Sequence, residues 1–185
     1  MSDLAPKRMT AEEFIAWAMT RPEGEHYELV AGEIVAMAPE KADHVRTKSR
    51  IWRLLADAIA KAGLECEAFA DGMSVRVDAD TLYEPDVIVR CGTRLSGDAT
   101  IAPDPLVLVE VRSPSTAYLD AGIKLSDYFR IPTVRHYLIV DLKRQVVIHH
   151  ERDAAGTITT RIVRDGAVRL DPPGIDLADI FEAEP

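Results

Sequence analysis

Two apolar runs in the middle of the chain each carry an acidic residue where a buried strand would not be expected to hold one. Residues 84–89 read EPDVIV, and residues 105–112 read PLVLVEVR. Burying a carboxylate without a partner costs on the order of several kcal/mol. Asp86 and Glu110 therefore need a stabilising group, and two acids on neighbouring strands indicate that they share a bound cation.

Carboxylate oxygens are the ligands that Mg²⁺ takes, usually one or two of them together with water and substrate phosphate. We therefore expect Mg²⁺, with Mn²⁺ as a substitute, to bind Asp86 and Glu110 and to activate water beside a phosphate ester. A purely structural interpretation stays open. In that case Asp86 forms a turn after a proline, and Glu110 pairs with Arg112 or Lys124.

The pattern of apolar residues and turn signals predicts an α/β fold. A capping box at Thr10 and Glu13 predicts a short N-terminal helix. Two longer helices are expected, one over 41–62 with Val45, Trp52, Leu55 and Ile59 facing inward and one over 117–130 with Ile123 facing inward. A strand at 135–141 is expected to pair in parallel with 106–111. The other expected elements are hairpins of 27–30 with 33–37 and of 65–70 with 73–77, strands at 145–150, 157–163 and 167–170, and a helical turn at 176–181. Because no repeat or low-complexity linker interrupts the chain, we expect one domain over 1–185, with a core at about 27–149 and C-terminal strands and a short helix at 150–185.

Several short motifs in this order resemble the Uma2 family (DUF820) of restriction-endonuclease-like proteins, within the PD-(D/E)xK nuclease superfamily. They are 27–34 (YELVAGEI), 84–86 (EPD), 109–116 (VEVRSPST), Asp120, Lys124, Tyr128 and 137–141 (YLIVD). The resemblance implies a restriction-endonuclease-like mixed β-sheet core, flanked by helices and preceded by an N-terminal helix and a β-hairpin. It also implies that Asp86 and Glu110 are metal ligands.

The chain departs from the superfamily pattern at Arg112, where a catalytic lysine usually stands. An arginine stays protonated and cannot act as a general base, but it can contact a phosphate. The resemblance implies that Lys124, on the following helix, takes over as the residue that orients the attacking water. Glu33, on the second strand of the hairpin, is a candidate auxiliary metal ligand, although an isolated glutamate on a strand more often faces solvent.

The helix at 41–62 carries the most basic surface of a chain whose formal net charge is −9. Arg46, Arg50 and Arg53 follow one face at helical spacing, and His44 lies at the start of the helix. We expect these four residues to contact nucleic acid, with weak and salt-sensitive binding because the chain as a whole is acidic. A solvated helix face paired with nearby acids is the alternative.

The resulting hypothesis is an Mg²⁺-dependent endonuclease that hydrolyses DNA, in which Asp86, Glu110, Lys124 and Arg112 form the catalytic group. Restriction-like folds commonly pair two protomers, so a homodimer is expected by analogy. Two alternatives stay open: a catalytically impaired nuclease-fold module that binds nucleic acid or regulates a partner, and a hydrolase of a small phosphoester.

The remaining features concern the location of the protein. Cys66 and Cys91 show no metal-ligand spacing, and we expect two free thiols in a reducing compartment. No apolar run reaches the roughly 20 residues that cross a bilayer, and residues 1–10 lack the hydrophobic centre of a signal peptide. We therefore expect a cytoplasmic protein with no membrane partner.

Overall fold

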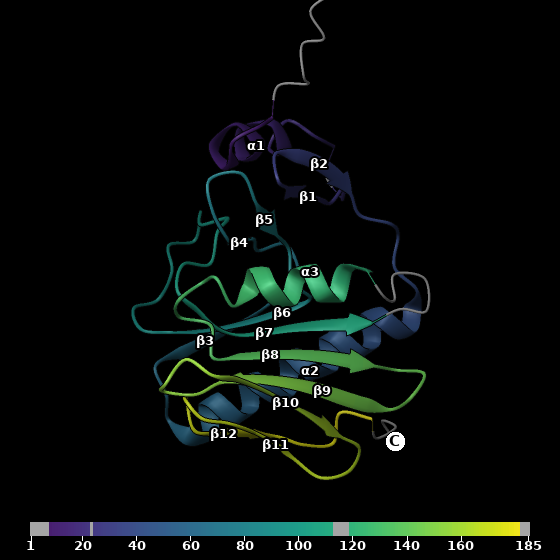
Figure 1. Cartoon of the computed structure of the whole chain (residues 1–185), viewed down its shortest axis with the longest axis vertical. Coiled ribbons are helices and arrows are strands. Elements are labelled where there is room, and N and C mark those ends of the chain that lie inside the picture. Colours follow the sequence, from purple (N-terminus) through teal and green to yellow (C-terminus); the bar gives the residue numbers. More distant parts are fainter. Residues whose placement is uncertain (1–7, 23, 113–118, 182–185) are drawn as a thin grey trace, which may run out of the picture.

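A six-stranded mixed sheet forms the centre of the computed structural model, which describes residues 8–22, 24–112 and 119–181 (Figure 1). The elements of this sheet, in spatial order, are β10 (Ile158–Val163), β9 (Val146–Arg152), β8 (His136–Asp141), β7 (Pro105–Arg112), β6 (Val87–Cys91) and β3 (Cys66–Ala70). The pair β7 and β8 is parallel, and every other pair is antiparallel. The predicted α/β class and the parallel pair are confirmed.

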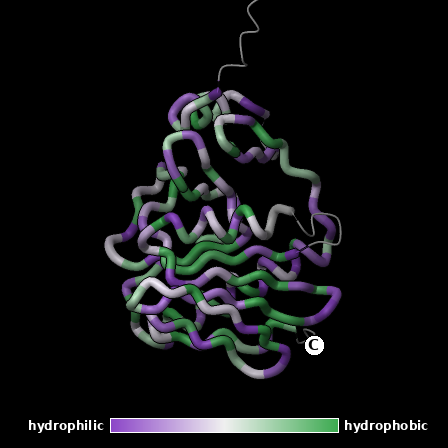
Figure 2. Tube along the Cα trace, in the orientation of Figure 1, coloured by the Kyte–Doolittle hydropathy of each residue, from purple (hydrophilic) through white to green (hydrophobic). Residues whose placement is uncertain are grey.

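A helix covers each face of this sheet, α2 (Ala42–Ala62) behind it and α3 (Leu119–Tyr128) in front of it in Figure 1. Leu55 and Ile59 of α2 pack on one face, together with Val109 of β7. Tyr128 of α3 packs on the other face, together with Leu108. Both faces are covered, so the central strands are apolar on both sides, and Figure 2 shows the hydrophobic segments gathered there.

A smaller four-stranded sheet lies at one end of the molecule (Figure 1). Its strands, in spatial order, are β2 (Glu33–Ala36), β1 (Tyr27–Val30), β5 (Leu82–Tyr83) and β4 (Val75–Arg76). Helix α1 (Ala11–Ala18) packs on it, and its N-terminus carries the predicted capping box. The chain passes from β5 directly into β6, so residues 84–86 connect the two sheets.

Two elements differ from the expected secondary structure. The predicted hairpin of 65–70 and 73–77 is wrong: β3 pairs with β6, whereas β4 pairs with β5 in the other sheet. Asp71 and Gly72 have φ angles of 55° and 75°, and this left-handed turn sends the chain from one sheet to the other. The predicted helical turn at 176–181 is also wrong, because Ile175 and Leu177 alternate with an exposed residue and form β12 (Ile175–Leu177), paired with β11 (Val168–Leu170).

The inner faces of both helices were also predicted incompletely. On α2, Leu55 and Ile59 are buried as expected, but Val45 and Trp52 are 41% and 39% exposed. Lys48 and Ile51 are buried in their place. The buried face of α2 is the one that contacts the sheet and β12, and Trp52 lies outside this face. On α3, Ile123 is 55% exposed. The predicted start of that helix, at 117, lies outside the described residues.

Cys66 and Cys91 form a disulfide, contrary to the expected free thiols. The antiparallel register of β3 and β6 sets these two residues directly opposite each other, and sequence spacing alone did not reveal this pairing. Within the described residues, no helix is long and apolar enough to cross a membrane.

Gly63 ends α2 with a φ of 63°, in the left-handed region. A Cβ at this position would meet no atom within 4 Å, so only backbone conformation opposes a side chain. We predict that Gly63→Ala lowers the free energy of unfolding by about 1 kcal/mol, measured by urea denaturation followed by circular dichroism. Gly97→Ala is the control, since Gly97 has equal space and no left-handed φ. Equal losses in the two variants would contradict this explanation.

Candidate metal centre

Asp86 and Glu110 lie at the same end of the β6–β7 pair. The antiparallel register sets Val87 opposite Val109. Asp86 directly precedes Val87, and Glu110 directly follows Val109. The Asp86 side chain turns toward β7, where its Oδ2 accepts a hydrogen bond of 2.6 Å from the backbone N–H of Val111.

Burial and charge both act on the Asp86 carboxyl group. Burial, and secondly the negative charge of Glu110, raise the pKa of Asp86 to about 7. His44 and the N–H of Val111 oppose this rise. A buried carboxyl group whose ionised form is disfavoured by burial and by a neighbouring carboxylate is the arrangement that a bound cation stabilises.

Glu110 is held by two donors from α3. Its Oε1 accepts hydrogen bonds from the Tyr128 hydroxyl at 2.6 Å and from Lys124 Nζ at 3.0 Å. Lys124 Nζ also lies 2.8 Å from Oε1 of Glu28. Although burial opposes the charged form, the carboxylates of Glu110 and Glu28 raise the pKa of Lys124 above its usual value. Lys124 is therefore an ammonium group at neutral pH.

Glu28 is a site residue that the sequence analysis missed. It is 8% exposed on β1, and its Oε1 accepts a hydrogen bond from the backbone N–H of Glu84 in addition to the contact with Lys124. Glu33, the predicted auxiliary ligand, lies exposed on β2. The signal that could have found Glu28 is the same as for Asp86 and Glu110, an acid inside an apolar strand.

His44 lies against Asp86 at the start of α2. Its Nε2 donates to the Val111 carbonyl oxygen at 2.7 Å and lies 3.5 Å from Asp86 Oδ2. An imidazole that carries its proton on Nε2 alone offers a lone pair at Nδ1. This buried Nδ1 has no hydrogen bond and lies 3.3 Å from Glu40 Oε1. Two acceptors this close need a proton or a metal ion between them.

Two groups of described residues bring metal-binding atoms within 4.8 Å of one another. The first consists of Glu40, His44 and Asp86, and the second of His26, Asp71 and Glu84. In the second group, Glu84 Oε1 accepts a hydrogen bond from His26 Nδ1 at 2.7 Å. The donor sets, carboxylate oxygens with one imidazole nitrogen, fit a divalent cation.

The predicted arginines lie in different surroundings. Arg112 Nη1 is 4.0 Å from Oδ2 of Asp141, which also pairs with Arg144. Arg46 is exposed and pairs with Asp43 one turn away on α2. On the same helix, Arg50 is half-buried and Arg53 is exposed. Of the four residues expected to contact nucleic acid, His44 is the one shown in contact with Asp86.

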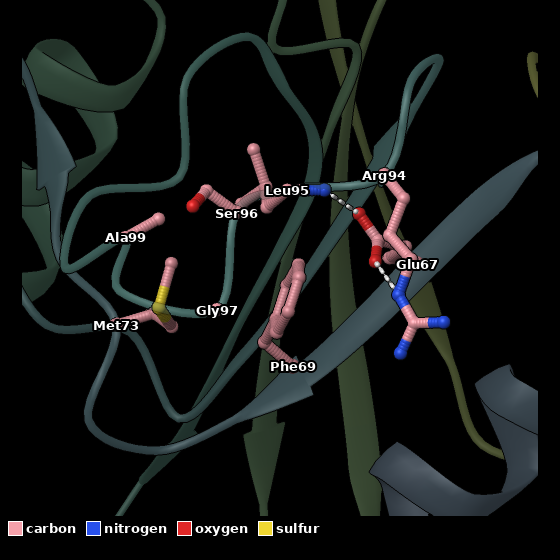
Figure 3. Close-up of a pocket in the computed structure, with 8 residues that line it drawn as sticks. All are labelled: Glu67, Phe69, Met73, Arg94, Leu95, Ser96, Gly97 and Ala99. Atoms are coloured by element: carbon pink, nitrogen blue, oxygen red, sulfur yellow. Dashed lines mark hydrogen bonds and ion pairs between the residues drawn. The ribbon is translucent and has the colours of Figure 1, made fainter.

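A separate pocket of about 340 Å³ opens between β3 and the loop that follows β6 (Figure 3). Figure 3 shows Glu67 in this pocket accepting a hydrogen bond from the backbone N–H of Leu95 and facing the Arg94 guanidinium. The lining residues include none of the predicted site residues. The acid that lines this pocket, Glu67, is paired with Arg90 and Arg94. Asp86 and Glu110 are therefore the better candidates for a metal site.

The raised pKa of Asp86 predicts how stability changes with pH. Between about pH 4 and pH 7 the folded state holds a proton that the unfolded state has released, so the free energy of unfolding falls as pH rises through this window. Asp86→Asn removes this loss. In metal-free buffer we predict that the variant gains roughly 2 kcal/mol more over the parent at pH 8 than at pH 5, measured by urea denaturation.

The matched control is Asp57→Asn, at an exposed position on α2. Its effect on the free energy of unfolding should be nearly the same at the two pH values. If the gain from Asp86→Asn were equally pH-independent, the buried and repelled state of Asp86 would be contradicted.

Comparisons with known proteins agree with this architecture. The chain is 25% identical over 173 residues to one uncharacterized protein of Synechocystis sp. (slr1290), covering 92% of this chain and 89% of the relative. A second, sll1609, is 28% identical over 131 residues, covering 69% and 73%. The fold matches the crystal structure of "a putative nuclease belonging to DUF820" from Anabaena variabilis, with a TM-score of 0.72, 17% identity and coverage of 94% and 97%. Residues 11–178 match the family model described as "Uma2: Putative restriction endonuclease", and the chain therefore belongs to the Uma2 family.

Proposed function

We propose that this protein is a metal-dependent endonuclease that hydrolyses phosphodiester bonds of DNA, with Mg²⁺ as its ion and Mn²⁺ as a substitute. The observation that carries this proposal is the Asp86 carboxyl, buried at the strand end that it shares with Glu110. Burial, and secondly the charge of Glu110, raise the pKa of Asp86 to about 7. Membership in a family described as restriction endonucleases supports the same reaction class.

Asp86 and Glu110 would hold the ion, and the imidazole of His44 and the carboxylate of Glu40 offer further ligand atoms beside Asp86. When bound, such an ion lowers the pKa of a coordinated water and stabilises the negative charge that develops on a phosphate. Tyr128 fixes one oxygen of Glu110 through its hydroxyl, so the carboxylate is already oriented toward the site before substrate binds.

Lys124 would orient the attacking water and offset charge on the scissile phosphate. Its ammonium is next to Glu110, and its raised pKa keeps it protonated, so it donates hydrogen bonds and does not act as the base. Arg112 would contact a neighbouring phosphate. Its Nη1 lies 4.0 Å from Asp141 Oδ2, which is too long for a hydrogen bond, so the guanidinium has donors left for a second acceptor.

DNA would reach the site along α2, where Arg46 and Arg53 are exposed. Because the net charge of the chain is −9, binding should be weak and should fall steeply with salt. Cleavage of both strands of a duplex needs two sites, which a homodimer would supply. A cytoplasmic location stays a prediction, since the disulfide between Cys66 and Cys91 does not support a reducing compartment.

The first test is nicking of supercoiled plasmid in Mg²⁺, Mn²⁺ or chelator. We predict that Glu110→Gln lowers the cleavage rate at least 100-fold, because the neutral amide loses both a metal ligand and the partner of Lys124. Glu33→Gln is the matched control, since its exposed side chain should leave the rate unchanged. Equal cleavage by the parent and Glu110→Gln in every condition would remove the enzymatic proposal.

A second test concerns Lys124, whose role can be separated from metal binding. We predict that Lys124→Met retains Mn²⁺ binding but cleaves plasmid at least 10-fold more slowly at saturating Mn²⁺, because the ammonium that orients water is lost. Lys61→Met, in the exposed last turn of α2, is the control. Cleavage by Lys124→Met at the parent rate would assign Lys124 a structural role only.

The alternative function is a nucleic-acid-binding module without turnover. The presence of Arg112 at the position where the superfamily pattern has a lysine is the observation that favours it. Such a module would bind DNA equally well in Mg²⁺ and in chelator and would leave plasmid uncut. An endonuclease would instead show cleavage that depends on the metal and on Glu110.

A further inference from the structure

Lys48 is a buried cation that neither the sequence analysis nor the proposed reaction uses. It projects from the middle of α2 and is 5% exposed. Its Nζ lies 2.5 Å from Oε2 of Glu40 and 2.6 Å from Oδ2 of Asp71. The ammonium group is therefore held between two acids.

The position of this ammonium relative to the two metal-binding groups is specific. Glu40 belongs to the group with His44 and Asp86, whereas Asp71 belongs to the group with His26 and Glu84. The backbone N–H of Asp71 donates to the backbone carbonyl of Asp86 at 3.3 Å. Lys48 thus links one carboxylate of each group.

The whole centre carries more negative than positive charge. Its carboxylates, connected by the contacts given above, belong to Glu28, Glu40, Asp71, Glu84, Asp86 and Glu110, and its ammonium groups belong to Lys48 and Lys124. One divalent ion at Asp86 leaves part of this charge unbalanced. Many enzymes that cleave phosphodiesters meet such an excess with two metal ions.

We propose that the Lys48 ammonium acts as a fixed cation in place of a second metal ion, so that the centre holds one divalent ion, on the side of Asp86. This inference rests on the proposed metal dependence. It also assigns a latent site to the other side. When the ammonium is absent, Asp71 is released, and its carboxylate with His26 and Glu84 can hold a second ion.

The test counts ions bound to the full-length protein by electron paramagnetic resonance of Mn²⁺, without any DNA. The parent should bind one Mn²⁺ per chain, and Lys48→Met should bind two. Lys48→Arg keeps the charge and should bind one. The control Lys61→Met, on the exposed last turn of the same helix, should also bind one.

A double variant keeps the inference testable if Lys48→Met alone is poorly folded, which circular dichroism would reveal. Adding Asp71→Asn neutralises one of the exposed acids left behind and removes a ligand, so Lys48→Met with Asp71→Asn should return to one ion. Two ions in the parent, or one ion in a folded Lys48→Met variant, would overturn the inference.

The outcomes separate this inference from the proposed function. If the parent binds one ion and cleaves DNA while Lys48→Met also binds one, the fixed-cation role fails and the endonuclease stands. If the parent binds one ion, Lys48→Met binds two and neither cleaves DNA, the endonuclease fails and the role of Lys48 stands. A parent that binds no ion would overturn both.

Discussion

The repulsion between the buried Asp86 carboxylate and the partly buried Glu110 carboxylate is the constraint around which the rest of the centre is arranged. An antiparallel register brings them to the same end of β6 and β7, and burial denies them the screening of water. Each acid is then stabilised from a different helix. Lys124 and Tyr128 of α3 hold Glu110, whereas His44 of α2 lies against Asp86. Side chains from the two helices on opposite faces of the sheet therefore contact acids at the same end of β6 and β7.

Most of the sheet could be predicted from sequence because its strands are short apolar runs separated by turn residues, and the parallel pair β7–β8 follows from the helix between them. The wrong hairpin and the missed disulfide have one physical source. Strand pairing is a long-range property, so a turn at Asp71 and Gly72 was read as a hairpin although β3 pairs with β6. The same register explains the disulfide, which spacing between Cys66 and Cys91 did not reveal.

The candidate site could likewise be predicted only in part. Asp86, Glu110 and Lys124 could be predicted, since acids inside apolar strands need a partner and a known family pattern supplied the lysine. Glu28 and Lys48 could not, because each is recognised only by what lies beside it in space: Glu28 by Lys124, and Lys48 by its two carboxylates. Helix α2, whose basic residues were expected to lie on its surface, thus also buries one lysine, Lys48.

Residues 84–86 connect the four-stranded sheet to the six-stranded one, and the centre lies at this junction. Glu28 comes from the small sheet and Glu110 from the large one, and Lys124 contacts both. Neither sheet alone can assemble this arrangement. A chain emerging from synthesis, or one partly unfolded by damage, would lack this complete set of groups. The proposed hydrolytic activity would therefore be confined to molecules in which both sheets have already packed together.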